Sequence, residues 1–312
     1  MCNYTVAYAS CLCNPQVALG GLAHAHRRRG VYVLDVDLPT VEVVDIPTRR
    51  ADVWPLGPGD AVLAGGTWLF SEPQPHLRRL IDITALGWEP VLLSDNGIEI
   101  AATCTVEQIA QLSAQLPEQR PDWTSAPLFR QCAGALKASF KVWKTATVGG
   151  NLCLSFPAGS MISLCSALDG EVLIWRADGT EHRMPLVDFV TGAATNRLAP
   201  GEVLRSVHLP AAALRAQTAY RKIAPSTLGR SGVVVIGRRD TPADGGATVV
   251  SVTGATVRPY VFTFPSPPAE EDLRAAHAEV PPDQWTDDAH GDPDWRAAMA
   301  LLLAREVTAE LA

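Results

Sequence analysis

The chain has 312 residues, of which 47% are hydrophobic and 19% are charged, and its formal net charge is −7. This balance is typical of a globular protein with a sizeable core, and the length favours one large or two unequal domains. The negative charge argues against nucleic acid or an anionic membrane as a partner. Seven cysteines in apolar contexts favour reduced thiols in the cytoplasm over a disulfide framework. The sequence has no apolar run of about 18 residues, so no membrane span is expected.

Residues 1–40 match no pattern that carries a known function. They contain a group of thiols and imidazoles whose spacing fits neither a zinc site nor an iron–sulfur site, namely Cys2, Cys11, Cys13, His24 and His26. An arginine run follows the apolar part, which is the reverse of the order in a signal peptide. The alternating, β-branched stretch 31–36 predicts a strand. We expect an N-terminal extension of unknown role.

From residue 41 onward, short apolar runs alternate with helical patterns. Strands are predicted at 41–44, 61–64, 80–83, 98–101, 171–175, 182–185 and 203–209. The pair Asp178-Gly179 predicts a hairpin turn. A helix is predicted over 105–116, because Thr105 can cap it and Gln108 stands three residues later, as in a capping box. Helical spacing also predicts helices at 127–136 and 160–168.

The Ala-, Pro- and Arg-rich stretch 210–216 predicts a domain boundary. The region beyond it alternates like an antiparallel meander, with strands predicted at 218–223, 232–237, 247–253 and 260–264. Asp244-Gly245-Gly246 predicts a turn between two of these strands. Apolar spacing from Ala297 onward predicts a closing helix over one face of this sheet, with Asp294 near its start.

Two glycine pairs, Gly65-Gly66 and Gly149-Gly150, each follow a short apolar run. Adjacent glycines let backbone N–H groups approach a ligand closely, and successive N–H groups turned the same way form a nest that suits phosphate oxygens. Thr67, Thr147 and Asn151 would add donors at the rim. Neither pair matches the G-x-G-x-x-G or P-loop motif. We therefore hypothesise two backbone cradles on one diphosphate, with two ordinary tight turns as the alternative.

The stretches Ala64-Gly65-Gly66-Thr67-Trp68-Leu69 and Ala146-Thr147-Val148-Gly149-Gly150-Asn151-Leu152-Cys153 resemble the paired flavin loops of one family. It comprises the FAD-binding medium subunits of molybdenum hydroxylases of the xanthine dehydrogenase and carbon monoxide dehydrogenase type. The similarity runs from about residue 41 to the end, and further matching segments lie at 80–83, 100–105, 166–170, 188–189, 201–204 and 220–222.

The resemblance implies an α+β protein. Residues 41–212 would form a two-subdomain FAD-binding fold of the vanillyl-alcohol-oxidase/PCMH type, with subdomains at about 41–97 and 98–212. Residues 213–312 would form a small C-terminal α+β domain.

By position, the residues implied to contact the pyrophosphate and ribityl region of FAD are Ala64, Gly65, Gly66, Thr67, Trp68, Leu69, Thr147, Val148, Gly149, Gly150 and Asn151. Ala102 and Thr103 would lie near the isoalloxazine or ribityl side, and Lys222 near the ring edge.

Three positions depart from the family pattern. Ser160 replaces an aspartate that would contact the ribose, although a hydroxyl can still bond a sugar hydroxyl. Lys141-Val142-Trp143-Lys144 replaces Gln-Ile-Arg-Asn, and Trp68 stands where a small polar residue is commoner. The indole of Trp68 would either cover the flavin or pack in the core.

The implied activity is electron relay. A large molybdopterin-binding subunit would hydroxylate a substrate, a [2Fe–2S] ferredoxin-like partner would pass electrons to this FAD, and NAD⁺, oxygen or a quinone would reoxidise it. The clusters are not expected in this chain, because its cysteines lack both [2Fe–2S] ligand spacings. Two alternatives remain: a stand-alone FAD oxidoreductase acting on its own substrate, and a non-catalytic subunit that has lost FAD.

No residue is predicted to be catalytic, because the sequence shows no nucleophile elbow, zinc motif or paired carboxylates. A flavin itself carries the redox chemistry. The cysteines at 104, 132, 153 and 165 are predicted to be buried, inert thiols. His76, His182 and His208 have no matched partners in the sequence, so they are predicted to be surface or structural residues rather than a catalytic base.

Overall fold

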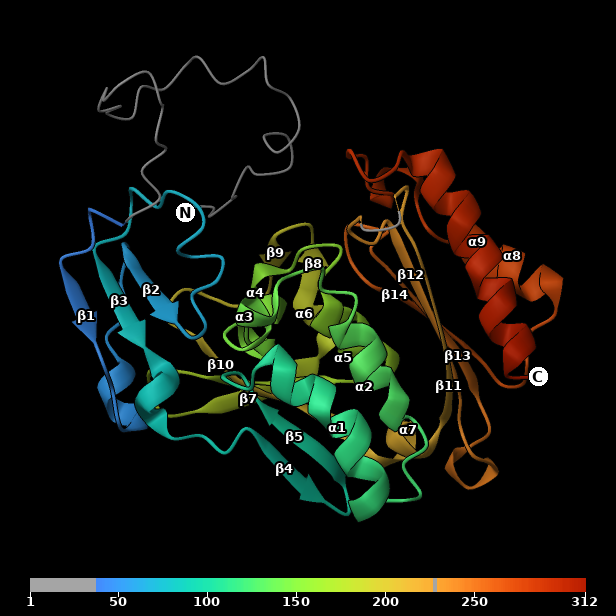
Figure 1. The fold of residues 1–312 in the computed structure, drawn as a ribbon, viewed down its shortest axis with the longest axis horizontal. Coiled ribbons are helices and arrows are strands. Elements are labelled where there is room, and N and C mark those ends of the chain that lie inside the picture. The colour runs from blue at the N-terminus through green and yellow to red at the C-terminus, as the bar shows by residue number, and fades with distance from the viewer. Residues whose placement is uncertain (1–37, 227–228) are drawn as a thin grey trace.

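The computed structural model describes residues 38–226 and 229–312. Figure 1 shows three successive layers: a small blue sheet, a larger sheet with green helices packed on it, and an orange sheet covered by red helices. The group of thiols and imidazoles at the start of the chain and the strand predicted at 31–36 lie outside the described residues. Within the described part, no helix is both long and apolar enough to cross a bilayer.

The first layer is a three-stranded parallel sheet with the order β1-β3-β2. Its strands are β1 (Val43–Asp45), β2 (Asp60–Leu63) and β3 (Arg79–Asp82), accompanied by the short 3₁₀ helices η1 (Arg50–Val53) and η2 (Ile83–Leu86). The strands predicted at 41–44, 61–64 and 80–83 are thus confirmed with small shifts. Strand β2 ends at Leu63 and delivers the chain directly into the first Gly-Gly pair.

The second layer is a five-stranded antiparallel sheet with the order β4-β5-β10-β6-β7. The strands are β4 (Val91–Ser94), β5 (Gly97–Ala101), β6 (Glu171–Trp175), β7 (Glu181–Pro185) and β10 (Val203–Pro210). Helices pack on one face: α1 (Val106–Gln119), α2 (Ala126–Ala133), α3 (Phe140–Trp143), α4 (Val148–Leu154), α5 (Ser160–Ala167), α6 (Leu186–Phe189) and α7 (Ala211–Arg215). Strands β8 (Val190–Gly192) and β9 (Thr195–Asn196) form a small hairpin.

Local sequence rules explain the start of α1. The Thr105 side chain accepts a hydrogen bond from the Gln108 N–H, and the Gln108 side chain accepts one from the Thr105 N–H, which confirms the predicted capping box. The helix then buries Val106, Ile109 and Leu116 against the sheet.

The third layer is the predicted meander, an antiparallel sheet with the order β11-β12-β13-β14. It consists of β11 (Gln217–Ile223), β12 (Val233–Arg239), β13 (Thr248–Thr253) and β14 (Tyr260–Phe264), with η3 (Pro242–Asp244) at the predicted turn. Helices α8 (Glu270–Ala278) and α9 (Pro293–Glu310), with η4 (Pro282–Gln284) between them, cover the outer face (Figure 1). The closing helix is therefore confirmed.

Helix α5 lies between the second and third layers. The buried guanidinium of Arg238 donates to the Ala167 carbonyl at 2.9 Å, and its Nη2 lies 2.7 Å from the Asp169 carboxylate. The hydroxyls of Ser163 and Thr253 lie 2.6 Å apart. These contacts fix α5 against β12 and β13, and they hold the third layer in place beside the segment that follows the second Gly-Gly pair.

Candidate functional site

The two Gly-Gly segments lie in direct contact. A Cβ on Gly65 would fall 1.8 Å from the carbonyl oxygen of Thr145 and 3.2 Å from the Cα of Ala146. Real Cβ atoms do not approach backbone atoms so closely, so only glycine permits this packing. Residues about eighty positions apart in sequence therefore meet, and Thr145 lies four residues before Gly149, the first glycine of the second pair.

The first segment offers a run of free donors. Within the described part of the chain, the backbone N–H groups of Gly65 to Leu69 have no hydrogen-bond acceptor, since the β2–β3 ladder ends at Leu63 and the turn starts with the bond from the Phe70 N–H to the Gly66 carbonyl. Gly66 has a φ of +67°, which turns the backbone in a way that L-residues with side chains rarely adopt. Successive half-buried N–H groups of this kind can surround phosphate oxygens.

The second segment differs from the sequence expectation. It is the first turn of α4, and its N–H groups already have acceptors: Val148 donates to the Cys104 carbonyl, Gly149 to the Ala102 carbonyl and Gly150 to the Thr147 hydroxyl. The expectation that this pair forms an open backbone cradle is therefore wrong. Its glycines instead allow close packing, because a Cβ on Gly149 would lie 2.5 Å from the Ala102 Cβ.

Other predicted site residues gather around this junction. The Asn151 carboxamide oxygen accepts a hydrogen bond from the Met161 N–H at 2.9 Å, which ties α4 to α5. Ser160 is only 1% exposed, and its hydroxyl has no partner among the described residues. Trp68 packs edge-on against Phe156, with ring centroids 4.8 Å apart. The Trp68 indole thus joins the first segment to the loop after α4.

An unpaired buried hydroxyl costs about 1–3 kcal/mol, and a hydrogen-bonding group of a ligand at Ser160 would remove that cost. Thr103 is half-buried and is likewise without a side-chain partner in the described ranges, whereas Ala102 is buried and donates its N–H to the Arg205 carbonyl. These free polar atoms and the free N–H run of the first segment fit a polar ligand with phosphate and hydroxyl groups.

Lys222 lies on β11, and its side chain interacts with that of Lys137. Lys222 is exposed overall, but partial desolvation of its amine, and next the neighbouring Lys137 charge, lower its pKa. Sequence reasoning did not identify Lys137, Thr145 or Phe156 as neighbours of the predicted site, since their contacts join segments far apart in the chain.

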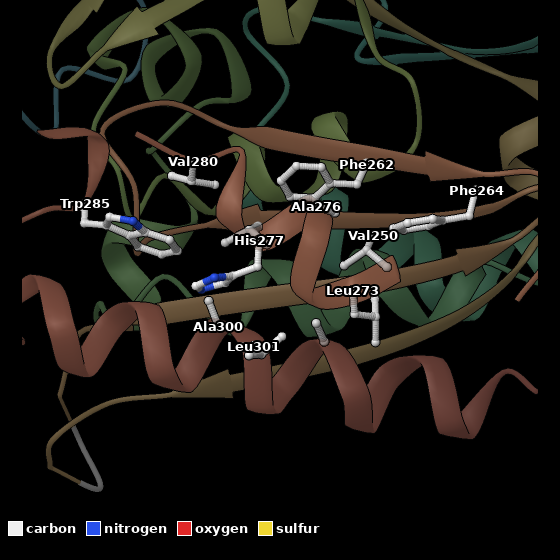
Figure 2. Close-up of a pocket in the computed structure, with 12 residues that line it drawn as sticks. Val250, Phe262, Phe264, Leu273, Ala276, His277, Val280, Trp285, Ala300 and Leu301 are labelled. Carbon is white, nitrogen blue, oxygen red and sulfur yellow. The ribbon is translucent and has the colours of Figure 1, made fainter. Parts of the chain in front are cut away.

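Two hollows lie away from these residues. An apolar cavity of about 20 Å³ lies between β13, β14, α8 and α9. Figure 2 shows side chains that line it, among them Phe262, Leu273 and Trp285. The cavity is only slightly larger than one water molecule requires and has almost no polar lining. A shallow depression on the five-stranded sheet contains His208, whose Nδ1 lies 3.5 Å from a Glu99 carboxylate oxygen, which fits the predicted structural role.

The cysteines behave as inert thiols. Cys104, Cys132 and Cys165 are buried and Cys153 is half-buried, and all four are free. Burial raises the pKa of Cys104 and of Cys165 to about 12, so neither is a thiolate near neutral pH.

Comparison with known proteins identifies the family of this chain. The family model described as the FAD binding domain in molybdopterin dehydrogenase matches residues 50–212, which is just over half of the chain. The chain belongs to this family. It is an FAD-binding subunit of the molybdenum hydroxylase family, and FAD is its cofactor.

Individual relatives agree with this membership. The chain is 29% identical to the nicotinate dehydrogenase FAD-subunit of Eubacterium barkeri over 224 residues, which cover 69% of this chain and 72% of that protein. Among solved structures, reconstituted CO dehydrogenase from Oligotropha carboxidovorans matches with a TM-score of 0.71 at 18% identity, covering 87% of this chain and 97% of that one. Quinoline 2-oxidoreductase from Pseudomonas putida 86 matches with a TM-score of 0.70 at 17% identity, covering 88% and 97%. These structures confirm the two-subdomain FAD-binding fold.

Proposed function

We propose that this chain relays electrons through its FAD, taking them from a [2Fe–2S] partner subunit of a molybdenum hydroxylase complex and passing them to NAD⁺, oxygen or a quinone. A molybdopterin-binding large subunit would oxidise the substrate. The observation that carries this proposal is the contact between Gly65 and Thr145, since it joins both predicted flavin segments into one site.

The residues present fit FAD in distinct ways. The free N–H groups from Gly65 to Leu69 would donate to the diphosphate, and the Ser160 hydroxyl would bond a sugar hydroxyl. Gly149 would position the first turn of α4 against Ala102 rather than donate to the ligand. Bound FAD supplies the redox chemistry, so this chain's residues need only bind, orient and shield it.

A relay subunit needs no acid or base of its own. The thiols beside the site have pKa values raised by burial, and the described residues contain no cluster of three or more metal-ligating side chains.

The experiment is anaerobic mixing of the FAD-loaded chain with the pre-reduced [2Fe–2S] subunit, followed by visible absorption. We expect the bands of oxidised flavin to fall on mixing and to recover when the acceptor is added. Flavin that stays oxidised beside the reduced subunit, but bleaches when the isolated chain meets a small organic substrate, would instead establish a stand-alone oxidoreductase.

A further inference from the structure

The lysines of this chain are few and are gathered in one place. Only four of the 26 basic residues are lysines, and all the others are arginines distributed over the chain. Three of the lysines, Lys137, Lys141 and Lys144, lie within eight residues around α3, and the fourth, Lys222 on β11, lies near enough to Lys137 for that charge to lower its pKa. The cluster thus spans the junction between the second and third layers.

These lysines have no acidic partners in the described part of the molecule. All four are exposed, and none of them donates a hydrogen bond to a carboxylate or forms an ion pair there. Arginines such as Arg79, Arg215 and Arg238, in contrast, form ion pairs with aspartates. Lys137 and Lys222 are also close enough for the charge of Lys137 to help lower the pKa of Lys222. In a protein with a net charge of −7, this is a local concentration of unneutralised positive charge.

An apolar side chain stands in the middle of the cluster. Phe140 is 69% exposed, the highest value among the exposed large hydrophobic residues of the described ranges. A protruding aromatic group surrounded by charged residues is the pattern of a protein interface, in which the ring is the buried anchor and the charges form the rim.

The cluster lies at the edge of the FAD site. Lys144 directly precedes Thr145, whose carbonyl oxygen contacts Gly65, and the Thr145 hydroxyl donates to the Lys141 carbonyl at 3.0 Å. A protein seated on α3 would therefore be only a few residues away from the flavin segments. Opposite charge on that protein would accelerate encounter and set its orientation.

We propose that the surface formed by Lys137, Phe140, Lys141, Lys144 and Lys222 docks an acidic face of the [2Fe–2S] partner protein. This inference rests on the proposed relay function and adds the place and the charge of the docking face. A binding site for a small anion would need only the Lys137–Lys222 pair and would leave Phe140, Lys141 and Lys144 without a role.

Zero-length carbodiimide cross-linking tests the proposal directly, because it joins lysine amines to carboxylates in contact. Since every lysine of the chain lies in this surface, a cross-link from any lysine to the partner reports docking there. In the complex with the [2Fe–2S] subunit, we expect mass spectrometry to find links from Lys137, Lys141 or Lys144 to partner aspartates or glutamates. Links that run only from this chain's carboxylates to partner lysines would overturn the proposal.

Charge reversal gives an independent test. We expect Lys137→Glu/Lys141→Glu to weaken binding of the [2Fe–2S] subunit at low salt by about tenfold or more, with FAD content unchanged. The matched control, Arg49→Glu/Arg274→Glu, makes the same charge change at arginines whose side chains are 78% and 60% exposed and form only surface ion pairs. The control should change binding by less than about twofold.

The outcomes separate the two proposals. If the wild type binds the subunit and the reversed variant binds equally well, the docking inference fails alone. If the FAD-loaded wild type neither binds the subunit nor takes electrons from it, the relay function fails and the docking inference with it. Weakened binding of an added anion such as inorganic phosphate, without any change in partner binding, would assign the lysines to a small ligand and overturn the docking surface.

Discussion

Gly65 lies so close to Thr145 that a methyl group at position 65 would fall 1.8 Å from the Thr145 carbonyl oxygen. This contact brings the N–H groups after β2, which have no acceptor among the described residues, next to the start of α4. The two glycine pairs have different tasks: the first exposes donors, and the second permits close packing of α4. In the flavin site that we propose, the two segments therefore contribute in different ways.

Gly149→Ala should separate packing from ligand donation. A Cβ there would lie 2.5 Å from the Ala102 Cβ and 2.8 Å from its carbonyl oxygen, so we expect a loss of about 1–3 kcal/mol in the free energy of unfolding and weaker FAD retention. Gly150→Ala is the matched control, since its nearest neighbour is the Thr147 hydroxyl at 3.1 Å. Chemical denaturation and flavin absorption measure both effects.

Because Gly150 is in the first turn of a helix, alanine there should be neutral or stabilising by up to about 1 kcal/mol. Equal damage from the two substitutions would show that the second pair acts as a ligand loop rather than as a packing contact.

Ser160→Ala tests the unpaired hydroxyl. We expect FAD affinity to fall by about tenfold, while the stability of the FAD-free protein stays the same or rises, because the hydroxyl has no partner in the described structure. Ser163→Ala, on the same helix, loses the 2.6 Å contact with Thr253 and should lower stability without changing affinity. Titration of the FAD-free variants with FAD measures the affinity of each. An unchanged FAD affinity in Ser160→Ala would show that Ser160 is not part of the site.

Asp244→Asn tests the acid sensitivity of the junction between α7 and η3. The Arg215 guanidinium, and next the Thr241 hydroxyl, lower the pKa of Asp244 from 3.8 to about 2. A carboxyl group whose pKa is lower in the folded state than in the unfolded state stabilises the fold at pH values above the unfolded-state pKa. This contribution is lost as the pH falls through the folded-state pKa. We expect the wild type to be more stable than the variant near neutral pH, with the difference disappearing between about pH 4 and pH 2. Urea unfolding of both proteins across this pH range measures the difference in stability. A difference that stayed constant would show that Asp244 does not titrate with a lowered pKa in the folded state.

Local sequence rules predicted much of the fold. The capping box of Thr105 and Gln108, the Asp178-Gly179 hairpin and the alternating strands of the meander depend on neighbours in sequence, so they could be read directly. The helical state of Gly149 and Gly150 could not, because glycine disfavours helices and the carbonyls that hold this turn belong to Ala102 and Cys104.

The candidate site was predictable as a set of segments but not as an arrangement. The motif resemblance named both glycine pairs, yet the contact between Gly65 and Thr145 and the meeting of Lys137 with Lys222 are long-range products of the fold. No local spacing distinguishes N–H groups that are free from those that already have acceptors.

The most direct test of a flavin site built on the contact between Gly65 and Thr145 is the flavin content of purified Gly65→Ala. This content is compared with that of Gly57→Ala and of the wild type. Position 57 is open, since a Cβ there meets only the Asp60 carboxylate at 3.7 Å. We predict about one FAD per chain in the wild type and in Gly57→Ala, and little or none in Gly65→Ala, with circular dichroism showing an intact fold in all three. A folded Gly65→Ala protein that keeps its full complement of FAD would contradict a flavin site built on the contact of these two segments.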